Sequence, residues 1–437
     1  MVRDSGRFMF QVSKSRLFQV TAFVAAVLGA ATSARAQAVP ELIPGRYIVT
    51  LHEQGGNDDG PGDLRNVDAV SNRNGVSVIH KYGYARKGFA ADLTPAALQD
   101  LRNDARVANI EQDQVVRLRG KPGSGGSTPT QPAQTIPWGI QRIAATSSST
   151  ASGNGAGSVD VDVAIIDTGI DTTHPDLNVV GGRNFTSRTA TNYADGNGHG
   201  THVAGTVAAK DNSIGVVGVA PGARLWAVRV LDSTGSGTMS GVIAGVDWVT
   251  ANASTIEVAN MSLGGGDSPT LNSAIDKAVA AGVTFVVAAG NSSVDAKSSS
   301  PANSTSKGVI TVSALSTDGT LASFSNFGLN YADDSGSENG VDVVAPGVNI
   351  NSTYKGGAYS TMSGTSMASP HVAGTAALCK AMNSTFTPAQ VKASVVQSAP
   401  GAYLGTGPGG VYGIAPWSAT SGDPDAFYEP LVNAGAY

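Results

Sequence analysis

The strongest constraint on the fold is an alternation of short apolar runs with longer helix-like stretches over residues 134–437. The apolar runs have the length of buried strands and occupy residues 161–167, 224–231, 257–263, 283–289 and 309–314. The helix-like stretches occupy residues 200–209, 238–250, 269–282 and 366–383. This order is typical of a parallel sheet with crossover helices on both faces. We therefore predict an α/β fold with a doubly wound, mainly parallel sheet.

Three segments of this region each place one polar residue among small residues, at the end of a predicted strand or the start of a predicted helix. Asp167 ends VAIID, His199 lies in GHGTHVAG, and Ser366 lies in GTSMASP. The chain order Asp, His, Ser is one of the orders in which hydrolytic triads occur. An alcohol needs an adjacent base to attack at neutral pH. We therefore predict Ser366 as a nucleophile, His199 as its base and Asp167 as the group that orients the imidazole.

With these three motifs, residues 134–437 resemble the subtilisin-type serine proteases, the subtilases. The resemblance implies a serine endopeptidase that acts through an acyl-enzyme, with broad, apolar-preferring specificity. Asn291, which follows an Ala-Ala-Gly segment, matches the family's side-chain oxyanion donor. A turn asparagine, common after glycine, is the alternative for this position.

The same resemblance assigns substrate-binding residues. Ser262, Leu263 and Gly264 match one wall of the family's cleft, and Ser236 and Gly237 match the opposite wall. Strand-like pairing on both sides explains why such enzymes cut extended peptide or protein segments. Gly264 and Gly290 indicate an open, apolar pocket for the residue before the scissile bond, although each glycine taken singly also fits a turn.

A structural calcium site is the cofactor that the resemblance implies. The segment 209–216 is similar to the family's calcium loop, and the matching ligands are Gln134, Asp176, Lys210, Asn212, Ile214 and Val216. Lys210, Ile214 and Val216 would bind through backbone carbonyls, and hard cations prefer such mixed oxygen ligands. The alternative is a turn loop without metal.

The first 133 residues divide into three further parts. Residues 1–36 have the basic start, apolar run and small-residue cleavage site of a secretory signal peptide; a membrane-anchored N-terminus is the alternative. Residues 44–118 show a β-α-β-β-α-β order that resembles the I9-type propeptide, which implies an intramolecular inhibitor; an accessory domain without that role is the alternative. Residues 119–133 are rich in Gly, Ser, Thr and Pro and indicate a flexible linker. The maturation cut would lie between about 119 and 134.

Composition limits the remaining function classes. The single cysteine, Cys379, excludes a disulfide within the chain. The net charge of −5 combines a basic segment 1–133 with an acidic segment 134–437. That asymmetry suits a basic propeptide docked on its own acidic protease domain. The alternative is that the arginines serve only the signal peptide. No segment of the chain is basic enough to indicate nucleic-acid binding. We expect a secreted, extracellular monomer with no membrane contact after signal cleavage.

Two rival interpretations stay open at this level. The HxxH pair of His199 and His202 is not one of them: no glutamate follows the first histidine, as a metalloprotease motif requires, and we interpret His202 as a structural residue. Gly266-Asp267-Ser268 superficially resembles a lipase-like motif without the leucine that would follow it. A non-catalytic, peptide-binding relative is the second interpretation, and the intact catalytic residues argue against it.

Overall fold

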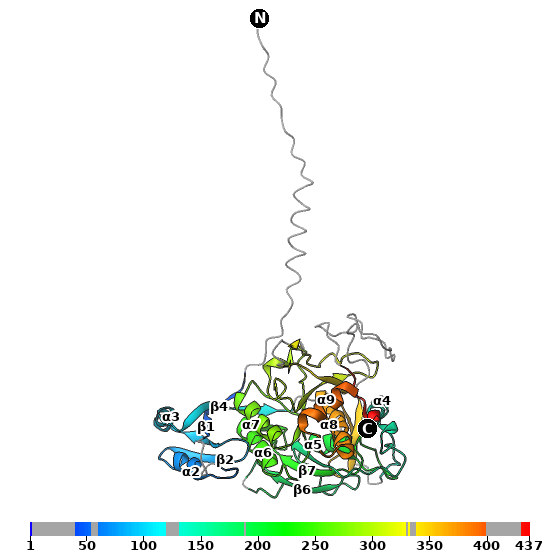
Figure 1. Ribbon diagram of the computed structural model, residues 1–437, viewed down its shortest axis with the longest axis horizontal. Coiled ribbons are helices and arrows are strands. Elements are labelled where there is room, and N and C mark those ends of the chain that lie inside the picture. The colour runs from blue at the N-terminus through cyan, green and yellow to red at the C-terminus, as the bar shows by residue number, and fades with distance from the viewer. Residues whose placement is uncertain are drawn as a thin grey trace. The chain divides into compact units, whose positions relative to one another are not determined.

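A seven-stranded sheet forms the centre of the molecule (Figure 1). The computed structural model describes residues 1, 40–53, 60–118, 131–187, 189–328, 331–332, 338–398 and 430–437. The strand order is β14-β11-β10-β9-β5-β7-β6, and every neighbouring pair is parallel. The strands are β5 (Asp162–Asp167), β6 (Val179–Asn184), β7 (Arg224–Arg229), β9 (Val258–Met261), β10 (Thr284–Ala288), β11 (Val309–Leu315) and β14 (Val343–Pro346).

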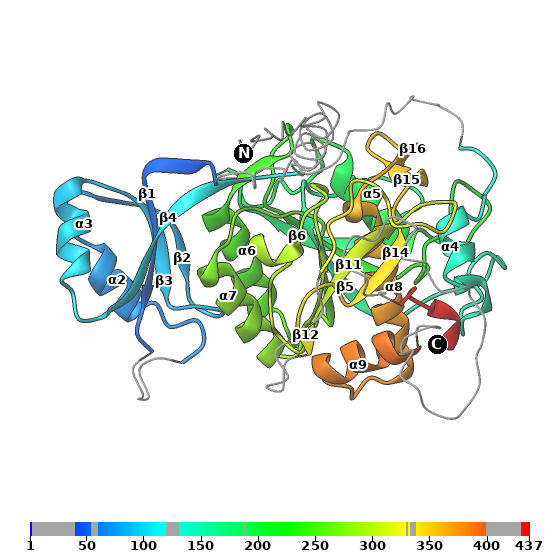
Figure 2. The same cartoon turned by 90° about the horizontal axis from the view of Figure 1, so that it is seen from above.

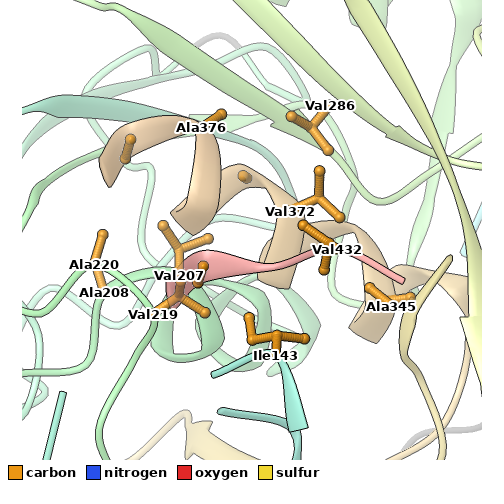
Figure 3. Packing of buried hydrophobic residues seen from close by; sticks show 14 of the residues in the cluster. Ile143, Val207, Ala208, Val219, Ala220, Val286, Ala345, Val372, Ala376 and Val432 are labelled. Atoms are coloured by element: carbon orange, nitrogen blue, oxygen red, sulfur yellow. The ribbon is translucent and has the colours of Figure 1, made fainter. Parts of the chain in front are cut away.

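Helices cover both faces of this sheet, which confirms the predicted doubly wound α/β fold. The helices are α5 (His199–Ala208), α6 (Met239–Ala251), α7 (Pro269–Ala280), α8 (Thr365–Met382) and α9 (Pro388–Ser398). Successive strand residues enter opposite cores: Val163 and Ile165 pack with α5, α8 and α9, whereas Ala164 and Ile166 pack with α6 and α7. Figure 3 shows the first core, where Val207 of α5, Val286 of β10 and Val372 of α8 lie together.

Residues 40–118 form a separate antiparallel layer with its own core (Figure 2). Its strands are β1 (Leu42–Leu51), β2 (Val76–Tyr82), β3 (Gly88–Leu93) and β4 (Val107–Arg117), and its helices are α2 (Arg65–Ser71) and α3 (Pro95–Arg102). The order β2-β3-β1-β4 continues into β8 (Ser236–Thr238) of the larger domain. The I9-like order of elements is thus present, and β4 extends as far as Arg117.

Several smaller elements complete the described chain. They are α4 (Trp138–Arg142), the strand pair β12 (Tyr331–Ala332) and β13 (Glu338–Asn339), and the hairpin β15 (Ile350–Tyr354) and β16 (Ala358–Met362). No helix in the described ranges is long and apolar enough to cross a membrane. The predicted signal peptide, apart from Met1, and linker residues 119–130 lie outside the described residues.

Candidate active site

Asp167 and His199 meet at the junction of β5 and α5. Asp167 is the last residue of β5 and His199 the first of α5. Nδ1 of His199 lies 2.8 Å and 2.9 Å from the two carboxylate oxygens, and both side chains are almost fully buried. An ionised carboxylate only accepts, so Nδ1 donates, and Nε2 is left as the acceptor. In the described part of the chain, Nε2 of His199 is buried without a hydrogen-bond partner.

Ser366 lies in the first turn of α8, which packs against α5. Its Oγ donates to the carbonyl of Ser262 at 3.0 Å, and Oγ of Ser262 donates to the carbonyl of Ser366 at 2.8 Å. A link from Ser366 Oγ to Nε2 of His199 is therefore not formed in this state. Links between nucleophile and base are often loose without bound substrate. The position in the first turn leaves the backbone N–H of Ser366 without a partner inside the helix.

Asn291 follows β10 through Gly290, whose φ of +109° suits glycine. Its Oδ1 accepts hydrogen bonds from the backbone N–H and the hydroxyl of Thr365, at 2.9 Å and 2.8 Å. Thr365 immediately precedes Ser366, so the amide is anchored beside that residue. Because its oxygen is used by Thr365, the Nδ2 group is the end that can donate to another atom.

A small cavity of about 10 Å³ opens beside Ser366. Its lining is almost entirely apolar and consists of Leu263, Gly264, Ala288, Ala289, Gly290, Ser299, Ser300, Ala302, Thr365 and Ser366. Both glycines that the sequence predicted for a pocket are therefore in its wall. A pocket with this lining fits an uncharged side chain.

The end of β4 lies between the two predicted cleft walls. Val115, Val116 and Arg117 pair antiparallel with Thr238, Gly237 and Ser236. On the other side, Arg117 forms an antiparallel bridge with Gly264. The next residue, Leu118, donates its N–H to the carbonyl of Gly235 at 2.9 Å. The chain's own residues 115–118 thus occupy the groove in the extended form expected of a peptide substrate.

Two carboxylates of the antiparallel layer 40–118 accept hydrogen bonds from helix starts of the larger domain. Asp113 accepts from the N–H of Ser240 at 3.0 Å, at the start of α6. Glu111 accepts from Oγ of Ser268 and from the N–H of Thr270, at the start of α7. These positions suit the partial positive charge of helix N-termini. Burial raises the pKa of Asp113, and its hydrogen bonds with Ser240 and Gln114 oppose that rise.

The predicted calcium ligands lie together around the segment 210–216. Asp176 accepts from Nδ2 of Asn212 at 2.8 Å and from the N–H of Val216 at 3.2 Å. Oε1 of Gln134 accepts from the N–H of Asn212 at 2.6 Å. Lys210 turns its ammonium to the carbonyl of Pro175. Ile214 donates its N–H to Oδ1 of Asn212 at 2.7 Å.

This donor set fits a hard cation. The Asp176 carboxylate is fully buried, and burial raises its pKa. It also accepts a hydrogen bond from the hydroxyl of Tyr359 at 3.2 Å. The described ranges contain no cluster of three or more His, Cys, Asp or Glu suited to a metal. The remaining oxygens come from amides and carbonyls, which calcium accepts readily.

The rival motifs have structural partners. His202 shares its Nε2 between the carbonyls of Ile350 and Ser360, each at 3.0 Å, so the HxxH pair does not form a metal site. Ser268 caps α7 by accepting from the N–H of Leu271 and donating to Glu111. It therefore behaves as a helix cap bound to the propeptide-like layer.

Sequence reasoning missed residues that hold the site together. Thr365 anchors Asn291, and Thr168 donates its N–H to Oδ1 of Asp167 at 2.7 Å. Asp247 of α6 accepts from the N–H groups of Gly83, Tyr84 and Ala85. A signal existed only for Thr168 and Thr365, which are adjacent to predicted catalytic residues.

Comparison with known proteins places these features in a family. The model of the subtilase family matches residues 158–424, and that of the peptidase inhibitor I9 family matches residues 46–119. Subtilisin E of Bacillus subtilis is 42% identical over 342 residues, which are 77% of this chain and 81% of that protein. M-protease of Shouchella clausii is 36% identical over 394 residues, 89% of this chain and 95% of that protein. The crystal structure of a cold adapted subtilisin-like serine proteinase is 40% identical, with a TM-score of 0.51, and covers 60% of this chain and 91% of that one.

Proposed function

This chain belongs to the subtilase family of serine peptidases and carries an I9-type inhibitor domain, and on that premise we propose that it is a secreted endopeptidase made as an inactive precursor. The proposed parts are a signal peptide (1–36), a propeptide (44–118), a linker (119–133) and a peptidase domain (134–437). The observation that carries the proposal is the buried Asp167–His199 pair, whose Nε2 has no hydrogen-bond partner among the described residues.

The proposed reaction begins with proton transfer from Oγ of Ser366 to Nε2 of His199. Oγ then bonds to the scissile carbonyl carbon, and Asp167 stabilises the imidazolium through its bond to Nδ1. His199 returns the proton to the leaving amine, which departs and leaves an acyl-enzyme on Ser366. Water, deprotonated by His199, then cleaves that ester and frees Ser366.

The developing oxyanion has two proposed donors. One is Nδ2 of Asn291, because Thr365 holds the oxygen end of that amide. The other is the backbone N–H of Ser366 at the start of α8. Both donors are fixed before the reaction, so they need no reorganisation as charge develops.

The groove supports extended peptide substrates with an apolar side chain before the cut. Ser236 and Gly237 on one side and Ser262 to Gly264 on the other would pair with the substrate backbone. Ser236, Gly237 and Gly264 pair with residues 116–117 here. The small apolar cavity beside Ser366 would take the side chain at the cut. We propose broad specificity limited mainly by that cavity.

The propeptide would act as an intramolecular inhibitor because its last described residues fill the groove. Since Leu118 is bonded to Gly235, we propose that the first cut falls beyond it, in the segment 119–133. Removal of residues 40–118 would then open the groove to other substrates.

A structural calcium ion is proposed at the loop that contains residues 210–216. Gln134, Asp176 and Asn212 would hold it with side-chain oxygens, and Lys210, Ile214 and Val216 with carbonyls. The ion would supply positive charge to the buried Asp176 carboxylate and thereby fix the loop.

The test compares the wild-type chain with Ser366→Ala and with Ser316→Ala, a serine in the turn after β11. A fluorogenic peptide and an ester are the substrates. We expect Ser316→Ala to match wild type and Ser366→Ala to lose peptide hydrolysis and remain an uncut precursor. Peptide cleavage by Ser366→Ala would refute the assignment, and inactivity of all three chains would favour a non-catalytic relative.

A further inference from the structure

Asp195 is a half-buried carboxylate in the loop that leads into α5. Its Oδ1 accepts from the hydroxyl of Thr168 at 2.9 Å and from the N–H groups of Asn197 and Gly198, each at 2.8 Å. Its Oδ2 accepts from the N–H and the hydroxyl of Thr201, at 2.9 Å and 2.6 Å. Five donors therefore converge on one side chain that touches neither Asp167 nor His199 by a hydrogen bond.

The two threonines extend these contacts to the opposite segment. Thr168, the residue after Asp167, accepts on its Oγ1 from the N–H of Gly200 at 2.9 Å. Thr201, two residues after His199, accepts on its Oγ1 from the N–H of Asp171 at 3.0 Å. The carboxylate thus joins the end of β5 to the first turn of α5 from both sides.

This junction tolerates little displacement. A methyl group on Gly200 would lie 2.1 Å from the carbonyl oxygen of Gly169 and 3.2 Å from Cβ of Asp167. Gly198, the residue before His199, has a φ of +113° and is tied to Asp195 through its N–H. The separation of the two segments also sets the 2.8 Å contact between Asp167 and His199.

We propose that Asp195 is a positioning residue for the catalytic reaction, and that it holds His199 against Asp167 by cross-linking the strand end to the helix start. The inference rests on the proposed function, because it assigns a support to that site. A carboxylate is required because all five partners are donors. An asparagine would turn an NH₂ group toward at least one backbone N–H, which cannot reverse its role.

The experiment measures kcat and KM for Asp195→Asn on a peptide substrate. Rates are normalised to active sites titrated with a serine-directed phosphonate, so that unfolded protein does not count. We expect kcat to fall about 10- to 100-fold, the size of loss that a small misplacement of reacting groups causes, with KM nearly unchanged. A purely structural role would lower the number of titrated sites and leave kcat per site intact.

Thr168 supplies a second, milder pair of variants. Thr168→Val removes the hydroxyl that links Asp195 to Gly200 but keeps the shape, and Thr168→Ser restores the hydroxyl. We expect Val to lower kcat, Ser to recover most of it, and the double variant with Asp195→Asn to lose less than the product of the single losses. If Asp195→Asn yields no titratable sites, the comparison of Thr168→Val with Thr168→Ser tests the positioning role instead.

Asp171→Asn is the matched control, because Asp171 also accepts backbone hydrogen bonds, from Thr173, Gly356 and Gly357, but bonds neither Thr168 nor Thr201 through its side chain. It should keep wild-type kcat per site. If a variant matures too slowly for kcat to be measured, the first-order rate constant of its precursor cleavage is compared with that of wild type instead. Normal kcat per site in Asp195→Asn, or equal kcat in Thr168→Val and Thr168→Ser, would overturn the inference. The proposed function fails separately, if Ser366→Ala retains activity.

Discussion

Replacing Asp247 by alanine should release the propeptide from the peptidase domain while leaving the peptidase itself intact. Asp247 lies on α6, and its carboxylate accepts from Gly83 N at 3.1 Å and from Tyr84 N and Ala85 N at 2.7 Å. Only 8% of Asp247 is exposed. Alanine is the strongest helix former, so the exchange does not weaken α6.

The size of the effect follows from the three donors that lose their acceptor. A fully buried orphan donor costs about 1–3 kcal/mol. A cavity of about 390 Å³ borders Asp247 and Tyr84, so water can reach part of this site and the lower end applies. Burial also raises the pKa of Asp247, and its hydrogen bonds with Gly83, Tyr84 and Ala85 oppose that rise. We expect a loss of about 3 kcal/mol, which corresponds to about 10²-fold in the inhibition constant Ki.

The assay titrates mature wild-type and Asp247→Ala enzymes with the same propeptide, residues 40–118, added in trans. Because one propeptide serves both arms, its own folding free energy cancels from the ratio of Ki values. Asp318→Ala, which removes an exposed carboxylate in a distant turn, controls for the change in charge. We expect Asp318→Ala to match wild type. A Ki for Asp247→Ala within about two-fold of wild type would show that these hydrogen bonds do not hold the propeptide on the peptidase domain, since three unsatisfied donors cannot cost so little.

Three further predictions follow from the site and the core. Asn291→Leu should lower kcat about 10²–10³-fold and leave KM nearly unchanged in steady-state kinetics. That loss is the one measured for such a donor in subtilisin itself. A change confined to KM would exclude the oxyanion role of Asn291. Burial lowers the pKa of His202 to about 3 and of His371 to about 4, so the unfolded chain takes up these protons first as pH falls below about 6.5. These two groups should together lower the free energy of unfolding by roughly 2–3 kcal/mol per pH unit between about pH 6 and 4. His371→Gln in a Ser366→Ala background should therefore reduce the measured slope by about 1.4 kcal/mol per pH unit, measured by urea denaturation beside Ser366→Ala alone. Calcium at 100 times its Kd should stabilise the chain by about 2.7 kcal/mol, and Asp176→Asn should abolish the response; an unchanged response would place the ion elsewhere.

The fold could be predicted where a local pattern decides the structure. Buried strands such as β5 and β11 are continuous apolar runs, and both were found within one residue of their expected ends. A threonine followed by a proline is typical of a helix start, and the side chain of Thr94 caps α3 by accepting from the N–H of Ala97. β6 was missed because its sequence, Val-Val-Gly-Gly-Arg-Asn, is half-exposed and rich in glycine. β14, a four-residue strand, is too short to show periodicity.

Tertiary contacts account for what the sequence could not show. β4 continues to Arg117 because Ser236–Thr238 pairs with its last residues, more than a hundred positions away. Asp195 and Asp247 look like surface carboxylates in the sequence, and their importance appears only when five and three donors converge on them. The motifs identify the residues proposed for chemistry, whereas the supports depend on partners that only folding brings near.

The most direct test of the central claim is to label the mature protein with a serine-directed phosphonate and to locate the adduct by peptide mass mapping. We expect one adduct per chain, on Ser366, and none in Ser366→Ala. We also expect His199→Ala to slow labelling by several orders of magnitude, because a serine hydroxyl without a base is a weak nucleophile. An adduct on another serine, or labelling of Ser366 at the wild-type rate without His199, would contradict that claim.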